Sequence, residues 1–199
     1  MDDERTPPER VRISRLQEVQ LPDIEKVDRA SAGMYEAAGF DAGVAKARSY
    51  ADLADLTRGH NVLVVEADWK PAGYVAWRDE APGVAVVEAL AVDPELQRFG
   101  LGGRLVEAVR DDARKAGLKH IVVRAWSQAA WAMGFLRKYG FHEVDTATLP
   151  NDVMAWVTRQ EQPGEPLVRP GEALLFAEVG EAAPEPEEPE ETPETEDLG

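Results

Sequence analysis

Hydrophobic and polar residues alternate over short stretches of the chain and recur every three or four positions over longer ones. Alternation is typical of strands, and the longer period is typical of helices. Strands are predicted at residues 11–16, 61–67, 72–78, 84–92, 120–125, 142–145 and 172–179. Helices are predicted at residues 22–39, 45–58, 101–116, 128–139 and 150–162, and several of them end at a glycine.

The connections between these elements indicate how the strands pair. Short turns at residues 68–71 and 81–83 join the second, third and fourth strands, which predicts an antiparallel meander. The helix at 101–116 connects strand 84–92 to strand 120–125, and such a crossover predicts that these two strands are parallel. The chain is therefore expected to form an α/β (α+β) domain whose mixed sheet is mostly antiparallel with one parallel central pair.

The helix at 101–116 has a clear amphipathic pattern. Its apolar stripe is expected to pack on the sheet and consists of Leu101, Leu105, Ala108, Val109, Ala113 and Ala116. Its polar residues are expected to face water: Arg104, Glu107, Arg110, Asp111, Arg114 and Lys115. Gly117 is expected to cap its carboxyl end.

A glycine-rich loop precedes this helix and favours phosphate binding. The segment reads Gln97-Arg98-Phe99-Gly100-Leu101-Gly102-Gly103-Arg104. The first amides of a helix lack intrahelical partners and lie at the positive end of its dipole, so small residues there allow a phosphate to approach. Leu105 stands where a Rossmann fingerprint requires its third glycine, and the chain has no Walker Gly-Lys-Ser/Thr tripeptide. An ordinary strand-to-helix turn is the alternative interpretation.

This segment resembles the acetyl-CoA signature of the GNAT superfamily of N-acetyltransferases. Residues 88–94 read Glu-Ala-Leu-Ala-Val-Asp-Pro and are similar to the strand end that precedes the signature in that family. Residues 97–102 are similar to the Gln/Arg-x-x-Gly-x-Gly/Ala loop that the family wraps around the pyrophosphate of acetyl-CoA. Strand, Asp-Pro, Gln-Arg and Gly-x-Gly together are more specific than Gly-x-Gly alone.

A second segment, residues 131–141, resembles the family pattern Trp-Asn-x-x-Phe-Tyr-x-x-x-Gly-Phe. The shared positions are Trp131, Phe135, Gly140 and Phe141. The chain departs from the pattern at Ala132, which replaces the Asn, and at Leu136, which replaces the Tyr. Leu136 has no proton to give to a departing thiolate, so the usual proton donor is missing at this position.

The resemblance covers about residues 11–179 and implies a fold, an activity and a site. The implied fold is a mixed central sheet with helices on both faces, and the implied activity is direct transfer of an acetyl group from acetyl-CoA, or another acyl-CoA, to an amine. It implies that the cosubstrate is held by Leu90, Ala91, Val92, Gln97, Arg98, Phe99, Gly100, Leu101, Gly102, Gly103, Arg104 and Phe135. Backbone N–H groups of residues 90–92 would stabilise the oxyanion, and Tyr35, Phe40 and Trp131 would line the acceptor pocket.

Glu88 is the candidate general base. On a two-residue period it shares a face with Val86, Leu90 and Val92, which places a carboxylate within an apolar face beside the glycine-rich loop. Loss of hydration there would make the carboxylate a better base. Two structural alternatives stay open: a bulge turns Glu88 outward, or Arg124 pairs with it. Family members also use a chain of water molecules instead of a single base.

Composition narrows the function and the domain boundaries. The 199 residues include no cysteine and carry a formal net charge of −16, and nine of the acidic residues lie in 181–199. Thiol chemistry is thereby excluded, and nucleic-acid binding is disfavoured because phosphates would be repelled. Residues 1–10 and 180–199 are polar and contain prolines, so they are expected to be disordered on either side of one domain at 11–179.

The remaining predictions concern location, metals and partners. An acidic start and the lack of a long apolar run predict a cytoplasmic protein with no membrane partner. His60, His120 and His142 lack ligand spacing, so no metal site is predicted. The acceptor is expected to be a small-molecule or peptide amine, and the oligomeric state is open, a homodimer included. A catalytically degenerate acyl-CoA-binding regulatory module and a protein-interaction domain are the alternative functions.

Overall fold

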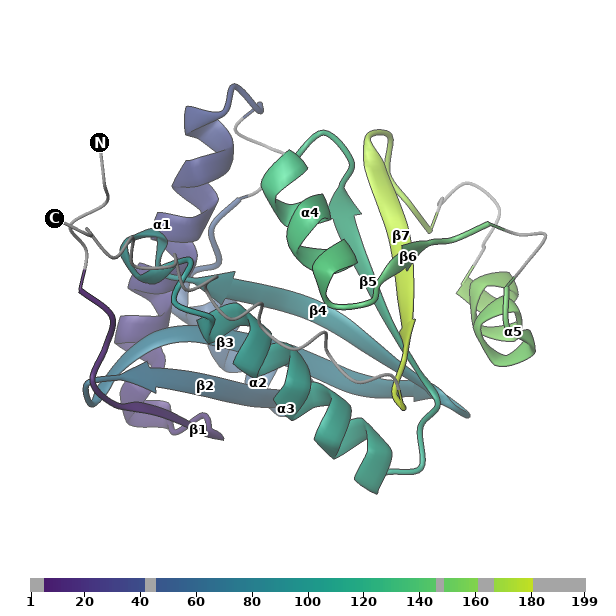
Figure 1. The fold of residues 1–199 in the computed structure, drawn as a ribbon, viewed down its shortest axis with the longest axis horizontal. Coiled ribbons are helices and arrows are strands. Elements are labelled where there is room, and N and C mark those ends of the chain that lie inside the picture. The colour runs from purple at the N-terminus through teal and green to yellow at the C-terminus, as the bar shows by residue number, and fades with distance from the viewer. Residues whose placement is uncertain (1–5, 42–45, 146–148, 161–166, 181–199) are drawn as a thin grey trace, which may run out of the picture.

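A mixed sheet of seven strands forms the centre of the molecule in the computed structural model, which describes residues 6–41, 46–145, 149–160 and 167–180 (Figure 1). In spatial order the strands are β1 (Val11–Arg15), β2 (Asn61–Ala67), β3 (Lys70–Ala81), β4 (Val84–Val92), β5 (His120–Trp126), β7 (Glu172–Glu178) and β6 (His142–Glu143). Neighbouring strands are antiparallel except for β4 and β5, which are parallel. The predicted mixed sheet with a parallel central pair is confirmed.

Helices cover both faces of this sheet, as predicted. One face packs against α3 (Leu101–Lys115) and α4 (Ala130–Lys138) and holds the largest apolar cluster. The opposite face packs against α1 (Leu21–Ala37) and α2 (Tyr50–Gly59) at one end and against α5 (Asn151–Gln160) at the other. Alternate residues of each strand enter the two layers, because successive side chains of a strand point to opposite faces.

Several element boundaries differ from the sequence-based expectation for local chemical reasons. The second helix begins at Tyr50 instead of residue 45, because the hydroxyl of Ser49 accepts from the amide of Asp52 while the Asp52 carboxylate accepts from the amide of Ser49. The strand expected at 72–78 extends over Lys70–Ala81, because Asp68 and Trp69 form the hairpin turn with positive φ values of 48° and 70°. The helix expected at 128–139 begins at Ala130.

Arg110 does not face water as its place among charged residues suggested. Its exposed fraction is 0%, since α4 packs against this side of α3. The guanidinium donates to the Glu107 carboxylate at 2.8 Å and to the carbonyl oxygen of Tyr139, and it lies 6.0 Å from the centre of the Phe141 ring. A buried guanidinium therefore joins α3 to the carboxyl end of α4, where helix carbonyls need donors.

Candidate functional site

The parallel strands β4 and β5 separate halfway along β4. Their pairing runs from Val84 opposite His120 to Val87 opposite Val123 and then stops. Beyond that point β4 continues beside β3 to Val92, and β5 continues beside β7 to Trp126 (Figure 1). The carboxyl-terminal half of β4 therefore has a strand partner on one side only among the described residues. The separation lies beside residues 90–92, where the cosubstrate was expected.

Glu88 is the extra residue of a β-bulge at the point of separation. Trp77 of β3 lies opposite Val87, and the next residue, Ala76, lies opposite Ala89, so Glu88 has no partner of its own. A bulge shifts the alternation of side chains by one position. As a result Val86 and Ala89 enter the α1, α2 and α5 side of the core, whereas Leu90 and Val92 enter the α3 and α4 side.

The expectation that Glu88 shares an apolar face with Val86, Leu90 and Val92 is therefore wrong. The Glu88 carboxylate lies 3.3 Å from Nη2 of Arg124, and its side chain is 30% exposed. Both structural alternatives, a bulge and an ion pair with Arg124, occur together. The side chain is solvated and paired, and the strong loss of hydration that the two-residue period indicated is absent.

A buried polar cluster supports the bulge from the α1 side. Nη2 of Arg48 donates to the carbonyl oxygen of Glu88 at 3.2 Å, and Nη1 of Arg48 lies 3.4 Å from Oδ1 of Asp28. The Tyr74 hydroxyl donates to the same Asp28 oxygen, and both Asp28 and Tyr74 are buried. Burial, and then the nearby charge of Asp28, raise the pKa of Tyr74 far above its usual range.

Sequence reasoning did not identify Arg48 as a site residue. The residue precedes α2, and nothing in its neighbourhood of the sequence distinguishes it from other surface arginines. Arg124 was considered only as a partner of Glu88, although a charged residue in an otherwise apolar strand is a visible signal. Chain folding alone brings Arg48 and Arg124 to the same bulge.

The glycine-rich loop has the backbone geometry of an anion-binding site. Arg98 and Gly100 adopt positive φ values of 72° and 77°, and Gly100 is the N-cap of α3 without a side-chain capping bond. The first intrahelical bond runs from the amide of Arg104 to the carbonyl of Gly100 at 3.1 Å. Amides of residues 101–103 thus have no hydrogen-bond partner among the described residues. These N–H groups lie at the positive end of the helix dipole, an arrangement that suits a bound phosphate.

The predicted loop residues have different roles in this structure. The Leu101 side chain is buried in the core, so only its backbone is available to a ligand. Nε2 of Gln97 donates to the Val92 carbonyl at 3.3 Å and to Sδ of Met34 at 3.1 Å, which fastens the loop to β4 and α1. Arg98 and Arg104 are exposed, and neither forms an ion pair with another described residue.

The two glycines at the start of α3 also receive aromatic side chains from α4. A Cβ atom at Gly102 would lie 3.1 Å from the Phe135 ring, and one at Gly103 would lie 1.9 Å from the Tyr139 hydroxyl. Phe135 and Tyr139 lie 4.9 Å apart between ring centres. Burial, and then the charge of Glu107, raise the pKa of Tyr139. The small residues therefore permit close packing of α4 as well as approach of a ligand.

The three residues predicted for the acceptor pocket come together between the end of α1 and the start of α4. Ring centres lie 5.5 Å apart for Tyr35 and Phe40, 5.3 Å for Tyr35 and Trp131, and 6.0 Å for Phe40 and Trp131, all in edge contacts. Burial raises the pKa of Tyr35. These residues form an aromatic cluster, and its role in binding an acceptor stays a prediction.

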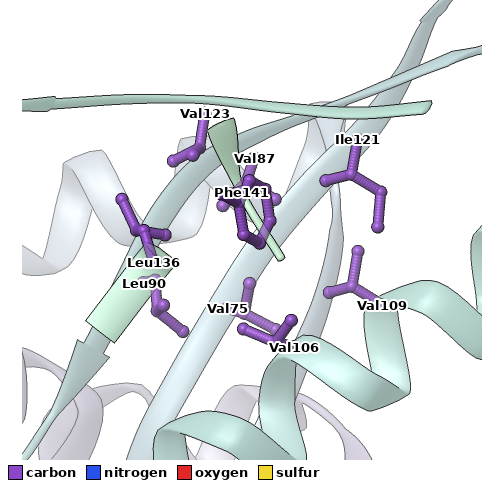
Figure 2. A pocket seen from close by; sticks show the side chains of 9 residues that line it. All are labelled: Val75, Val87, Leu90, Val106, Val109, Ile121, Val123, Leu136 and Phe141. Carbon is purple, nitrogen blue, oxygen red and sulfur yellow. The ribbon is translucent and has the colours of Figure 1, made fainter. Parts of the chain in front are cut away.

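An apolar pocket lies beneath the separation of β4 and β5, on the side of α3 and α4. Figure 2 shows its side chains pointing toward one another: Val75, Val87, Leu90, Val106, Val109, Ile121, Val123, Leu136 and Phe141. Leu136 is only 4% exposed and takes part in this lining. The position at which the family pattern has a tyrosine hydroxyl is thus occupied by a buried hydrocarbon side chain.

The described residues contain no group of three or more His, Asp or Glu side chains that could hold a metal ion. Within the part of the chain that the structure describes, no helix is both long and apolar enough to cross a bilayer.

Comparison with known proteins matches the chain to a family. The model of the acetyltransferase (GNAT) family matches residues 34–141, which include the glycine-rich loop and α4. No curated protein sequence matches the chain.

Solved structures show the same fold. The PaiA N-acetyltransferase from Thermoplasma acidophilum, in complex with coenzyme A, is 16% identical with a TM-score of 0.68, covering 85% of this chain and 99% of that one. The ribosomal-protein-S18-alanine N-acetyltransferase from Escherichia coli is 18% identical with a TM-score of 0.61, covering 87% and 96%. The N-acetylglutamate synthase from Neisseria gonorrhoeae, with coenzyme A and N-acetyl-glutamate, is 20% identical with a TM-score of 0.57, covering 86% of this chain and 35% of that one.

Proposed function

The chain belongs to the acetyltransferase (GNAT) family, and on this premise we propose that it is an N-acetyltransferase. It moves an acetyl group from acetyl-CoA, or another acyl group from its CoA thioester, to an amine by direct attack. The observation that carries the proposal is the separation of β4 from β5 beyond Val87, beside the uncapped start of α3. The coenzyme A in two structures of similar fold supports an acyl-CoA as the cosubstrate.

Residues on the α3 and α4 side would bind the cosubstrate. The amides of residues 101–103 suit the pyrophosphate, and the exposed guanidinium groups of Arg98 and Arg104 add positive charge beside it. The extended thioester arm can pair with the free backbone edge of residues 90–92, as an added strand does. Backbone N–H groups there would also hold the carbonyl oxygen as it gains charge.

Glu88 would take the proton from the amine. It lies at the bulge where the strands separate, and its partners Arg124 and Arg48 lie on the same side of the sheet as α1. An amine reaching Glu88 from that side would meet a thioester bound from the α3 side. The carbon–nitrogen bond then forms, the carbon–sulfur bond breaks, and the sulfur leaves with the electron pair. Proximity of the two reactants supplies much of the rate.

Leu136 favours a second candidate, a catalytically degenerate acyl-CoA-binding module. Its buried side chain lines the apolar pocket and offers no proton to the departing thiolate. In the transferase interpretation this proton comes from water, and general acid assistance worth about a hundredfold to ten-thousandfold is missing. The enzyme would then be slow. In the second interpretation the domain binds acyl-CoA and transfers nothing.

One pair of measurements distinguishes these candidates. Acetyl-CoA is titrated into the protein by calorimetry, and thiol release from acetyl-CoA is followed with a panel of amines and peptide N-termini. A transferase binds acetyl-CoA and releases thiol only when a productive amine is present. Binding without amine-dependent release by any member of the panel would leave the degenerate module as the function.

Restoring the missing hydroxyl sharpens the test. Leu136→Tyr places a donor at the family position, at a packing cost of about 1–3 kcal/mol because a larger side chain must fit at a buried position. The rate of amine-dependent thiol release should rise by up to about a hundredfold. Leu136→Phe, which adds the ring without the hydroxyl, is the matched control. An equal rate for Tyr and Phe would show that proton donation at this position is irrelevant.

A further inference from the structure

The charged groups at the bulge indicate which amines fit the site, an inference that rests on the proposed function. The Glu88 carboxylate is held by a single nitrogen of Arg124, at 3.4 Å from Oε1 and 3.3 Å from Oε2. Good bonds between a guanidinium and a carboxylate measure about 2.7–2.9 Å and use two nitrogens. About a third of each side chain is exposed, 30% for Glu88 and 35% for Arg124. Such a long, partly exposed pair contributes little stability and is easily exchanged.

Arg48, in contrast, is committed to the protein. Its backbone amide donates to Oδ2 of Asp28 at 2.6 Å, and its guanidinium contacts Oδ1 of Asp28, the Tyr74 hydroxyl and the Glu88 carbonyl. Asp28 is 5% exposed and balances the Arg48 charge from within the core. Arg48 therefore acts as a positioning residue that fixes the bulge, and Arg124 is the guanidinium whose partner can change.

Charge balance separates two kinds of acceptor. The site holds two guanidinium groups and two carboxylates, so it is neutral as it stands. A simple protonated amine would add a positive charge and compete with Arg124 for the single carboxylate of Glu88. An acceptor that also carries a carboxylate adds no net charge. Its carboxylate can replace Glu88 on Arg124 while its ammonium pairs with the released Glu88.

The short distance between the two groups also limits the acceptor. Glu88 and Arg124 are in direct contact, so the ammonium and the carboxylate that exchange with them must lie close together. An α-amino acid, in which one carbon atom separates the two groups, meets this requirement. A chain with several carbon atoms between amine and carboxylate would have to fold back on itself.

We propose that the acceptor is a small α-amino acid whose carboxylate binds Arg124 and thereby frees Glu88 to take a proton from the amine. The ammonium nitrogen gives a proton to the Glu88 carboxylate, and its lone pair forms the bond to the acyl carbon. The carbon–sulfur bond breaks with its electron pair going to sulfur, and the second proton that the nitrogen loses passes through water to the thiolate. Glu88 returns its proton to solvent and pairs again with Arg124 after the acyl amino acid leaves.

The test compares acceptors that differ in the carboxylate or in its distance from the amine. Thiol release from acetyl-CoA is measured with amino acids, their α-amides, the amines formed by decarboxylation, and 6-aminohexanoate. A charged hydrogen bond to the carboxylate should raise kcat/KM for at least one amino acid by roughly ten- to a hundredfold over its amide. Equal rates for acid and amide throughout the panel would overturn the inference and leave the transferase function intact.

Two variants trace the effect to Arg124. In Arg124→Gln the preference for acid over amide should fall to near one, because only the acid loses its binding partner. Arg12→Gln is the matched control, since Arg12 also pairs across strands with a glutamate, Glu66, at the far edge of the sheet. A preference that survives in Arg124→Gln would overturn the assignment.

Binding measurements distinguish failure of this inference from failure of the proposed function. Acetyl-CoA affinity should be the same in the parent, Arg124→Gln and Arg12→Gln, because the cosubstrate lies on the opposite side of the sheet. Thiol release with monoamines but not with amino acids would sustain the transferase and remove the amino-acid acceptor. No thiol release with any amine, despite tight acetyl-CoA binding, would contradict both the transferase function and the amino-acid acceptor.

Discussion

The two halves of β4 differ in what surrounds them. Val84 to Val87 has strands on both sides and is buried throughout, with regular alternation between the two layers of the core. Glu88 to Val92 has a strand on one side, begins with a bulge, and is accompanied by Arg48 and Arg124. The first half is a structural element, and the second half is where charged groups and unpaired backbone collect.

The contrast shows that one strand can stabilise the sheet in one half and leave backbone groups open to a ligand in the other. A strand paired on both sides satisfies its own backbone groups and leaves nothing for a ligand. Where the neighbour turns away, the same backbone becomes an edge that a ligand can complete. The bulge at Glu88 marks the change between these two states, and a buried Asp28 and Tyr74 hold it in place through Arg48.

The largest effect is expected from removing the proposed general base in the second half of β4. Glu88→Gln keeps the shape of the side chain but removes the base, so turnover should fall by about a hundredfold to ten-thousandfold while acetyl-CoA affinity is unchanged. Amine-dependent thiol release and calorimetry measure the two quantities. Glu66→Gln, on β2, is the control for removing a paired glutamate from the sheet. A loss of less than threefold in turnover would argue for a water chain as the base.

A loss of stability is expected from a substitution that weakens packing at the paired half of β4. Ile121 of β5 is fully buried where β5 pairs with β4, so Ile121→Ala should lower the free energy of unfolding by about 2–5 kcal/mol. Ile121→Val should cost about 0.5–1.5 kcal/mol. Denaturant unfolding followed by fluorescence measures both. A cost below about 1 kcal/mol for the alanine variant would mean that the paired half is not the stabilising one.

A smaller effect, confined to binding, is expected at the loop that follows the second half. Gly102→Leu would press against Phe135, 3.1 Å from a Cβ atom, and would cover the first amides of α3. Acetyl-CoA affinity should fall by about a hundredfold, as when several charge-assisted hydrogen bonds are weakened. Gly134→Leu, where a Cβ atom meets nothing within 4 Å, is the matched control. Unchanged affinity in a folded Gly102→Leu protein would place the phosphates elsewhere.

The smallest effect is expected outside both halves. We propose that residues 11–179 form the whole catalytic domain. Residues 1–5 and 181–199 lie outside the described part of the chain, so the prediction for them rests on composition alone. Truncation after Gly180 should leave the melting temperature within a few degrees and acetyl-CoA affinity unchanged, since the tail has almost no apolar residue to bury. A large fall in either quantity would show that the tail docks on the domain.

Much of the fold follows from local patterns in the sequence. The order of strands and helices, the parallel pair joined by α3 and the position of the glycine-rich loop before α3 are confirmed, because each depends on periodicity or on residues adjacent in the chain. Gly39 and Gly117 end their helices with positive φ values of 85° and 73°, as glycine after a helix does. Errors in element boundaries occur where local capping decides, as at the start of α2 with Ser49 and Asp52.

The candidate site was predictable only in part. The loop residues could be proposed because a helix start and its glycines are contiguous in sequence, and Tyr35, Phe40 and Trp131 were proposed from the resemblance. The surroundings of Glu88 were not predicted correctly, because a single inserted residue reverses the alternation of side chains on which the prediction relied. Whether these residues bind an acyl-CoA and an amine stays a prediction.

The sequence by itself determined which elements form and that a glycine-rich loop leads into α3, since those properties depend on neighbours in the chain. The tertiary structure alone decided the burial of Arg110, the end of β4–β5 pairing at Val87, and the meeting of Arg48, Glu88 and Arg124. These features depend on contacts between residues far apart in sequence, such as Asp28 with Tyr74. Local propensity carries no information about such contacts, and here they set the charge and the shape of the site.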